Sequence, residues 1–233
     1  MSMVINIHAG HNPDGKIACG ATSLLKESTE ARNVKNEVIR QLQLLGHTVY
    51  DCTVDDGRNQ QDVLNKIIKK CNSHKKSDGK HVDLDVSIHF NSAANDLNGN
   101  GKTTGTEVYI YSLTAGAKAY AQRTVDSIAA LGFKNRGVKT AVDLRVLRET
   151  NAPAMLIECC FVDDADDAKL YDAQSMANAI VYGITGQHYV APTPSVEDAT
   201  IYRVQVGAFR SKANAEKLKA ELISKGYQPF ITK

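Results

Sequence analysis

Three short apolar runs carry a histidine or a glutamate at or near their carboxyl ends, and this feature constrains the fold more than any other. The runs and their polar residues are 4–11 with His11, 84–92 with His89, and 155–158 with Glu158. Such runs are typical of buried strands. The three polar residues are far apart in the sequence, so only a fold can bring them together. In an open α/β sheet, side chains at the carboxyl ends of neighbouring strands converge.

The residue types are those of a hydrolytic metal site. A fourth run, residues 24–27, places Glu27 where a helix is about to begin. Two histidines and one glutamate make an open zinc site, which leaves a coordination position for water. A further glutamate close to the metal is the general base that this chemistry needs.

Four motifs in a fixed order give a specific resemblance. They are Gly10-His11, Leu25-Lys26-Glu27, Ser87-Ile88-His89-Phe90-Asn91-Ser92, and Leu156-Ile157-Glu158 followed by Phe161. With these motifs the chain resembles the zinc-dependent N-acetylmuramoyl-L-alanine amidases of the Amidase_3 family, over about residues 3–186. Residues 135–138 and 144–148 also resemble family sequence.

The resemblance implies an activity and a set of roles. It implies that His11, Glu27 and His89 bind Zn²⁺ and that Glu158 is the catalytic base. The implied substrate is bacterial peptidoglycan, cut at the amide between N-acetylmuramic acid and L-alanine of the stem peptide. Asn91, Arg145 and Arg148 are candidate substrate contacts. Arginine suits stem-peptide carboxylates because it pairs with them bidentately, although a surface salt bridge is an equal alternative for both arginines.

Two positions near the predicted site stay open. Glu30 lies one helical turn after Glu27, so it competes for the third ligand position; the motif favours Glu27. His8 stands where the family usually has Asp. It either orients a ligand through its ring nitrogen or has no role in the site.

Two rival sites deserve comparison. Cys159 and Cys160 follow Glu158 and suggest a cysteine hydrolase, but the sequence carries no signature of that class. Residues 96–107 match the spacing of a calcium loop, with Asp96 and Glu107 as its two acidic positions. No helix is predicted on either side of that segment, so a glycine-rich connection is the favoured interpretation and calcium stays open.

Composition and charge give no indication of a nucleic-acid or membrane partner. The 233 residues carry a net charge of +2, which gives no indication of nucleic-acid binding. No apolar run is long enough to insert into a membrane, and the first residues do not match a signal peptide. We therefore expect reduced cysteines and a cytoplasmic protein until it is released to the cell wall, as a phage endolysin or a mother-cell autolysin would be.

Predicted strands and helices alternate through residues 1–187, the expected zinc amidase domain. Strands are predicted over 3–8, 47–52, 84–89, 106–111, 144–147 and 154–160, and helices over 27–45, 59–71, 114–131 and around 176–184. This order predicts an α/β fold in three layers: a mainly parallel twisted sheet with helices on both faces.

A linker over residues 188–200 and a small module over residues 201–233 are expected next. The module resembles the first half of a SPOR domain, a peptidoglycan-binding unit. We predict a β-α-β unit with strands over 202–209 and 227–231 and a helix over 214–225. So short a unit buries little core by itself, so we expect either a homodimer that pairs two such halves or a truncated sequence.

Two other functions remain as alternatives to wall hydrolysis by an amidase. One is a wall-binding protein whose amidase fold has lost catalysis. The other is a zinc peptidase that cuts the stem peptide at a different bond.

Overall fold

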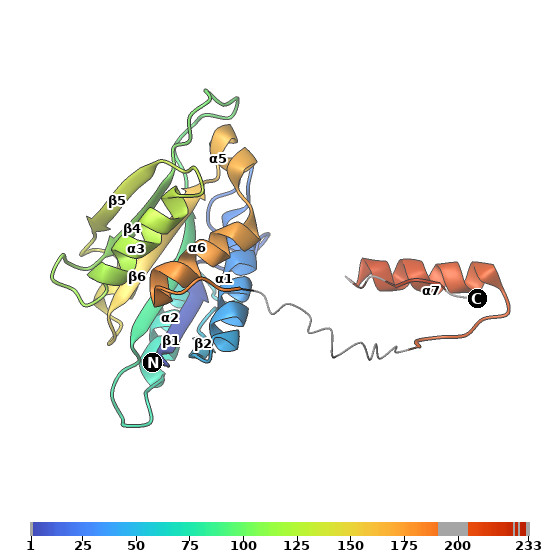
Figure 1. Ribbon diagram of the computed structural model, residues 1–233, viewed down its shortest axis with the longest axis horizontal. Helices are drawn as coiled ribbons and strands as arrows, with labels where there is room; N and C mark the ends of the chain where they lie inside the picture. The colour runs from blue at the N-terminus through green and yellow to red at the C-terminus, as the bar shows by residue number, and fades with distance from the viewer. Residues whose placement is uncertain (1, 191–204, 226, 228, 232–233) are drawn as a thin grey trace. The chain divides into compact units, whose positions relative to one another are not determined.

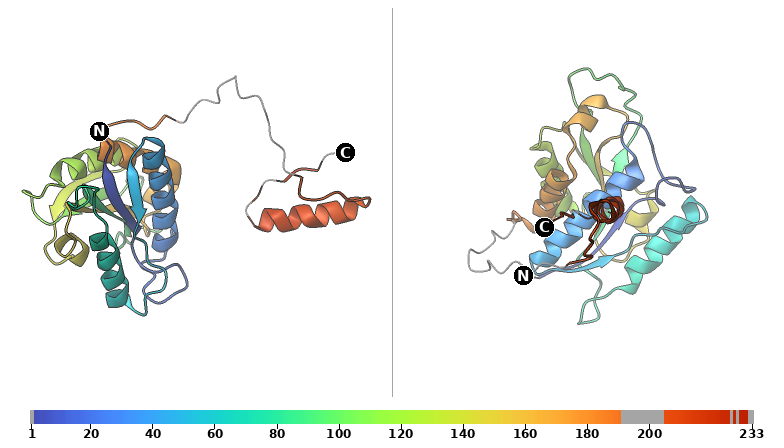
Figure 2. Two further views of the ribbon diagram at one scale, coloured as in Figure 1. Left: turned by 90° about the horizontal axis from the view of Figure 1, so that it is seen from below. Right: turned by 90° about the vertical axis from the view of Figure 1, so that its right-hand side faces the viewer.

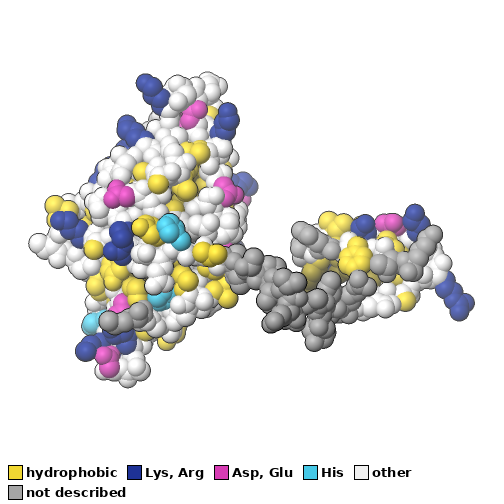
Figure 3. All heavy atoms as spheres, viewed as in Figure 1, with side chains coloured by type: hydrophobic (Ala, Val, Ile, Leu, Met, Phe, Trp, Pro, Cys, Tyr) yellow, Lys and Arg dark blue, Asp and Glu magenta, His cyan; other side chains and the backbone are white. Residues whose placement is uncertain are grey.

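The computed structural model describes residues 2–190, 205–225, 227 and 229–231 (Figure 1). The chain divides into two compact units, Met1–Val190 and Ala191–Lys233. Among the described residues, no helix is both long and apolar enough to cross a bilayer. Side chains of both charge signs are scattered over the face drawn in Figure 3, in keeping with the small net charge.

The first unit is built on one six-stranded sheet in the order β2-β1-β3-β6-β4-β5. The strands are β1 (Val4–Ala9), β2 (Thr48–Asp51), β3 (Leu84–Asn91), β4 (Thr106–Ile110), β5 (Asn135–Thr140) and β6 (Ala154–Phe161). All neighbouring strands are parallel except β4 and β6, which are antiparallel. The predicted α/β fold with a mainly parallel sheet is therefore confirmed.

Helices cover both faces of this sheet (Figures 1 and 2). They are α1 (Glu27–Leu44), α2 (Gln60–Ser73), α3 (Lys118–Ala129), α4 (Arg145–Arg148), α5 (Ala165–Leu170) and α6 (Ala173–Thr185). The larger core joins α1, α3 and α6 to one face, and the smaller core joins α2 and α4 to the other. This gives the three layers that the sequence predicts.

Strand periodicity decides which side chains reach which core. In β1, Ile5 and Ile7 enter the larger core, so Asn6 and His8 project to the opposite, α2 face. In β6, Ile157 enters the larger core and Glu158 projects to the α2 face in the same way. The polar residues of interest therefore gather on one face of the sheet, at the carboxyl ends of its parallel strands.

Three elements of the fold differ from the prediction. The strand expected over residues 144–147 is wrong, because residues 145–148 form the short helix α4, which buries Val146 and Leu147 in the smaller core. A run of four residues is too short for its periodicity to separate a strand from a helical turn. The sequence also missed β5, whose polar residues pack at the sheet edge, and the six-residue helix α5.

The second unit contains α7 (Lys212–Ser224), close to the predicted helix. Of the two strands expected beside it, residues 202–204 and 228 lie outside the described residues. The described residues 205–209, 227 and 229–231 form no strand. A strand needs a partner to pair its backbone groups, and two strands alone are only marginally stable. Apolar side chains of this unit are consequently exposed, among them Phe209 and Phe230.

Candidate metal centre

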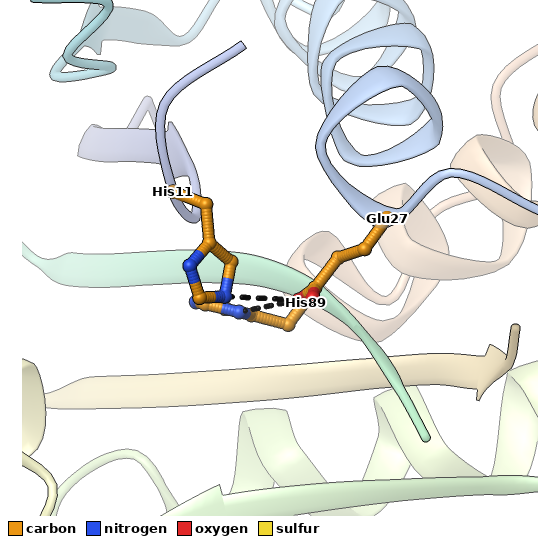
Figure 4. Close-up of side chains that lie close together, drawn as sticks. All are labelled: His11, Glu27 and His89. Carbon is orange, nitrogen blue, oxygen red and sulfur yellow. Dashed lines mark hydrogen bonds and ion pairs between the residues drawn. The ribbon is translucent and has the colours of Figure 1, made fainter. Parts of the chain in front are cut away.

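His11, Glu27 and His89 converge at the carboxyl end of the sheet (Figure 4). His11 follows β1, Glu27 is the first residue of α1, and His89 lies on β3. Glu27 Oε1 is 2.9 Å from His89 Nδ1 and 3.3 Å from His11 Nε2. The two imidazole rings meet edge to face, with their centroids 5.0 Å apart.

The three side chains fit a zinc ion. Their donor atoms lie within 4.8 Å of one another, and a tetrahedral zinc with bonds of about 2.0–2.2 Å holds neighbouring donors roughly 3.3 Å apart. Small side-chain movements would therefore surround one ion with two nitrogens and one carboxylate oxygen. In the described part of the chain, this is the one group of three or more metal-competent side chains that lie so close.

The backbone at His11 is held in an uncommon conformation. His11 has φ 64°, in the left-handed region that non-glycine residues rarely adopt. The guanidinium of Arg32 donates from Nη2 to the His11 carbonyl at 3.0 Å and also binds Asp55 at 2.6 Å. Gln60 Oε1 lies 3.3 Å from His11 Nδ1, which leaves Nε2 for the ion. These contacts offset the cost of the left-handed backbone and orient the His11 ring toward Glu27.

Two glycines leave room for the site. A Cβ on Gly10 would come within 2.0 Å of the His89 ring, so Gly10 is needed for the ring to lie beside β1. Gly20 has φ +79°, and a Cβ there would come within 2.5 Å of Glu27 Oε2. The Gly-His motif therefore reflects close side-chain packing.

Electrostatics keep Glu27 ionised beside the two histidines. Burial alone would raise the pKa of Glu27, but hydrogen bonds to His11 and His89 outweigh it and lower the pKa well below its usual range. Burial would lower the pKa of His11, but the hydrogen bond and charge of Glu27 raise it instead. An ionised Glu27 is the form that a cation needs as a ligand.

Glu158 stands beside His89 in the parallel register between β3 and β6. Its Oε2 is buried and has no hydrogen-bond partner within the described residues. Burial, together with the negative charges of Glu27 and Glu107, raises the pKa of Glu158 well above its usual range. A carboxylate held this way is a strong acceptor for a proton.

A cleft of about 480 Å³ opens over these residues. Its walls include all four site residues and come from the α2 helix and the segment around α4. His8 also reaches this cleft. Burial lowers the pKa of His8 to about 3, so the ring is neutral, and its Nδ1 is 3.4 Å from Ser87 Oγ. His8 therefore lines the cleft, and its hydrogen-bond partner is Ser87.

Glu30 lies away from the site. It accepts hydrogen bonds from Asn33 and from the Tyr171 hydroxyl. Of the two acidic residues at the start of α1, only Glu27 reaches the histidines.

The rival cysteine site finds no support in the structure. Cys159 and Cys160 are fully buried in the larger core. Burial raises the pKa of both thiols well above their usual range, so neither forms a thiolate readily. The structure does not favour the calcium loop either. Glu107, one of its two acidic positions, is paired with the cations Arg136 and Lys139.

The predicted substrate contacts are partly engaged within the protein. Asn91 and Arg145 line the cleft. Asn91 donates to Glu107 at 2.8 Å, and Arg145 binds Glu149 at 2.6 Å. Arg148 also binds Glu149, at 2.8 Å. The sequence did not indicate Arg32 and Gln60, whose contacts with His11 are remote in sequence. It marked Glu107 only as a possible calcium ligand, and the structure places it beside Asn91 instead.

Comparisons with known proteins agree with this geometry. The family model described as N-acetylmuramoyl-L-alanine amidase matches residues 5–186, and that of the SPOR domain matches residues 198–233. The chain is 36% identical to an N-acetylmuramoyl-L-alanine amidase of Bacillus licheniformis over 153 residues, which cover 64% of this chain and 56% of that protein. It is 34% identical to a sporulation-specific N-acetylmuramoyl-L-alanine amidase of Bacillus subtilis, with the same coverage.

A solved structure shows the same fold. The catalytic domain of the CD27L endolysin, which targets Clostridium difficile, superposes with a TM-score of 0.68 at 26% identity. The match covers 80% of this chain and 98% of that one. In contrast, the chain spans about half the length of the curated relatives it matches.

Proposed function

Because this chain belongs to the N-acetylmuramoyl-L-alanine amidase family, we propose that its first unit hydrolyses the amide between N-acetylmuramic acid and L-alanine in peptidoglycan. The observation that carries the proposal is the convergence of His11, Glu27 and His89 beside Glu158, in one cleft. The similarity to named N-acetylmuramoyl-L-alanine amidases supports the choice of substrate. The geometry of the cleft supports metal-assisted hydrolysis as the reaction class.

We propose that zinc is the resident metal, held by His11, Glu27 and His89. When bound, zinc acts as a Lewis acid that polarises a carbonyl and makes water a better nucleophile near neutral pH. Glu27 supplies the negative charge that favours a cation, and Gln60 holds the His11 ring so that Nε2 faces Glu27.

Glu158 is the proposed base. Its unpartnered oxygen lies in the cleft wall next to His89, where it can take a proton from the attacking water and return it to the leaving amine. Burial and the neighbouring carboxylates favour the protonated form of Glu158, which is the form that returns the proton. The same carboxylate in its ionised form would be required at the start of the reaction.

The experiment that tests this function measures metal content and wall hydrolysis together, before and after chelation. We expect one zinc per chain, with hydrolysis lost to the chelator and restored by zinc. A metal-free protein that remains active would reject the site. A metal-loaded protein that binds walls without clearing their turbidity would favour the non-catalytic alternative.

Mass spectrometry of the released fragments identifies the bond. An intact stem peptide with a free L-alanine amine supports the amidase, whereas shortened peptides support a zinc peptidase. We propose wall lysis as the setting, as in a phage endolysin or a mother-cell autolysin, with the protein made in the cytoplasm.

The second unit supports a separate proposal. The SPOR match suggests that residues 198–233 bind peptidoglycan, and exposed apolar side chains such as Phe209 and Phe230 suggest that two copies cover each other in a homodimer. Light scattering after size exclusion tests the pairing: a monomer at every concentration would reject it. Pull-down on purified walls, with the first unit alone for comparison, tests the binding.

A further inference from the structure

A second buried carboxylate lies one strand beyond Glu158, and the proposed reaction does not use it. Glu107 of β4 stands opposite Glu158 of β6 in the antiparallel register, so both side chains leave the same face of the sheet. Glu107 is only 2% exposed. Its carboxylate accepts from four donors: Asn91 Nδ2 at 2.8 Å, the Tyr109 hydroxyl at 2.8 Å, Arg136 Nε at 2.7 Å, and Lys139 Nζ.

Glu107 contacts two cations, Arg136 and Lys139, at this edge of the sheet. Glu158, the opposite residue on β6, is a second carboxylate on the same face. The side chains of Arg136 and Lys139 are 29% and 38% exposed, so both cations are accessible from solvent.

Arg136 is held in a fixed orientation. Its Nε is taken by Glu107, and its guanidinium carbon lies 5.0 Å from the centroid of the Phe161 ring. In the part of the chain that the structure describes, neither terminal Nη group of Arg136 has a hydrogen-bond partner. A guanidinium presents its donors as a planar fork that matches a carboxylate, and here the free side of the fork is preorganised.

Arg136 lies at a distance from Glu158 that a short stretch of stem peptide can span. Glu158, Glu107 and Arg136 lie on three successive strands, β6, β4 and β5, which places Arg136 about 10 Å from Glu158 at the usual spacing of strands. An extended peptide advances roughly 3.3 Å per residue. A peptide that runs from the cleft along this row would therefore bring its second or third residue to Arg136. Asn91 joins the two places, because it lines the cleft and donates to Glu107.

We propose that Arg136 and Lys139, held in place by Glu107, form a subsite for a carboxylate of the stem peptide, two or three residues from the scissile amide. This inference rests on the proposed function. It predicts that the protein distinguishes stem peptides whose carboxylates are free from those in which they are amidated, because a carboxamide lacks the charge that the subsite binds.

The first test compares two soluble substrates, a muramoyl tripeptide with free carboxylates and its carboxamide counterpart. We expect the zinc-loaded full chain to favour the free acid by about tenfold in kcat/KM, the effect of one charge-assisted pair. Arg136→Gln should slow cleavage of the acid and leave cleavage of the amide nearly unchanged. Equal slowing of both substrates would show a merely structural role and overturn the subsite.

Three further variants sharpen this test. Arg136→Lys keeps the charge but loses the fork, so it should recover only part of the preference. Arg40→Gln is the matched control, because Arg40 pairs with Glu37 on the exposed side of α1 and should leave the preference intact. If Arg136→Gln does not fold, Lys139→Gln carries the same test, and an unchanged acid preference in that folded variant would count against the subsite.

The second test measures binding without turnover. Calorimetry with the free stem tripeptide, as acid and as amide, reports the subsite even if the protein cuts neither muramoyl substrate. Tighter binding of the acid that depends on Arg136 would support the subsite and, with no cleavage, reject the proposed reaction. Equal binding of acid and amide by the unmodified chain, together with cleavage of both at one rate, would keep the reaction and overturn the subsite.

Discussion

Glu158 and Glu107 stand opposite each other on adjacent strands, yet their surroundings are opposite in character. Glu158 has an unpartnered buried oxygen and a raised pKa, caused first by burial and then by neighbouring negative charges. Glu107 is buried, at 2% exposure, whereas the Glu158 side chain is half-buried. The contacts of Glu107 with Lys139 and Arg136 outweigh the effect of its burial and lower its pKa. One carboxylate is thus poised to change its protonation state and the other is fixed as an anion.

The difference teaches that position in the sheet does not decide the role of a buried acid. Both side chains leave the same face at the same level. The supply of donors decides: Glu107 receives hydrogen bonds or ion pairs from four side chains, and the free oxygen of Glu158 receives none among the described residues. The carboxylate with a strongly raised pKa is therefore the one that lacks hydrogen-bond donors.

The largest effect should come from removing the proton acceptor. Glu158→Gln should lower hydrolysis by roughly 100- to 10,000-fold, the usual contribution of general acid–base catalysis, while zinc content stays at one per chain. Activity and metal analysis on the same sample provide the measurement. Glu30→Gln is the control, because Glu30 lies outside the cleft, and comparable losses in both variants would remove Glu158 from its special role.

Removing the other carboxylate should affect stability more than chemistry. Glu107→Gln leaves two neighbouring cations without their anion, so we expect a loss of about 2–4 kcal/mol in the free energy of unfolding. Denaturant titration measures it. Lys80→Gln, which breaks an exposed pair with Asp78, should cost less than about 1 kcal/mol. A similar small loss in both would mean that the cations find other partners.

The variant that destroys activity should also stabilise the fold. In metal-free protein near neutral pH, Glu158→Gln removes a carboxyl group whose ionisation is disfavoured by burial and by two other carboxylates, and we expect a gain in the free energy of unfolding. A carboxyl group with a raised folded pKa stabilises the fold below its unfolded pKa of about 4.3 and loses that contribution as pH rises. The gain should therefore vanish at low pH and grow as pH rises through the native pKa of Glu158.

Thermal unfolding as a function of pH measures this gain. A benefit that is constant from acid to neutral pH would show that packing, and not charge, is responsible.

The smallest effect should come from removing one donor to Glu107. Tyr109→Phe deletes a hydroxyl that lies 2.8 Å from the carboxylate, so we expect a loss of about 1 kcal/mol in stability. The pKa of Glu107 should rise, as NMR titration of the carboxyl carbon would report. An unchanged pKa would mean that the two cations alone set the charge state of Glu107.

The buried strands were predictable because bulky apolar residues recur at alternate or successive positions through them. The runs that became β1, β3 and β6 could be recognised without any partner. The edge strand β5 could not, since its six residues are polar at most positions and owe their conformation to pairing with β4. The four residues of α4 were mistaken for a strand for a related reason: their conformation depends on the smaller core beneath them.

The metal-competent residues were found because motifs report on local sequence. The motif favoured Glu27 over Glu30, and the fold supplies the physical reason: Glu27 contacts His89 of β3, whereas Glu30 contacts Tyr171 between α5 and α6. Arg32 and Gln60 could not be found from the sequence. They contact His11 from 21 and 49 positions away, and no local pattern marks them.

The order of the strands has a consequence for how the protein is made. β6 lies in the middle of the sheet, between β3 and β4, although it is the last of the six strands to leave the ribosome. Until residues 154–161 emerge, β1 to β3 and the pair β4–β5 have no shared strand to join them. A nascent chain therefore carries its three metal-competent side chains well before it acquires Glu158, so synthesis itself delays the assembly of a complete site until the central strand is inserted.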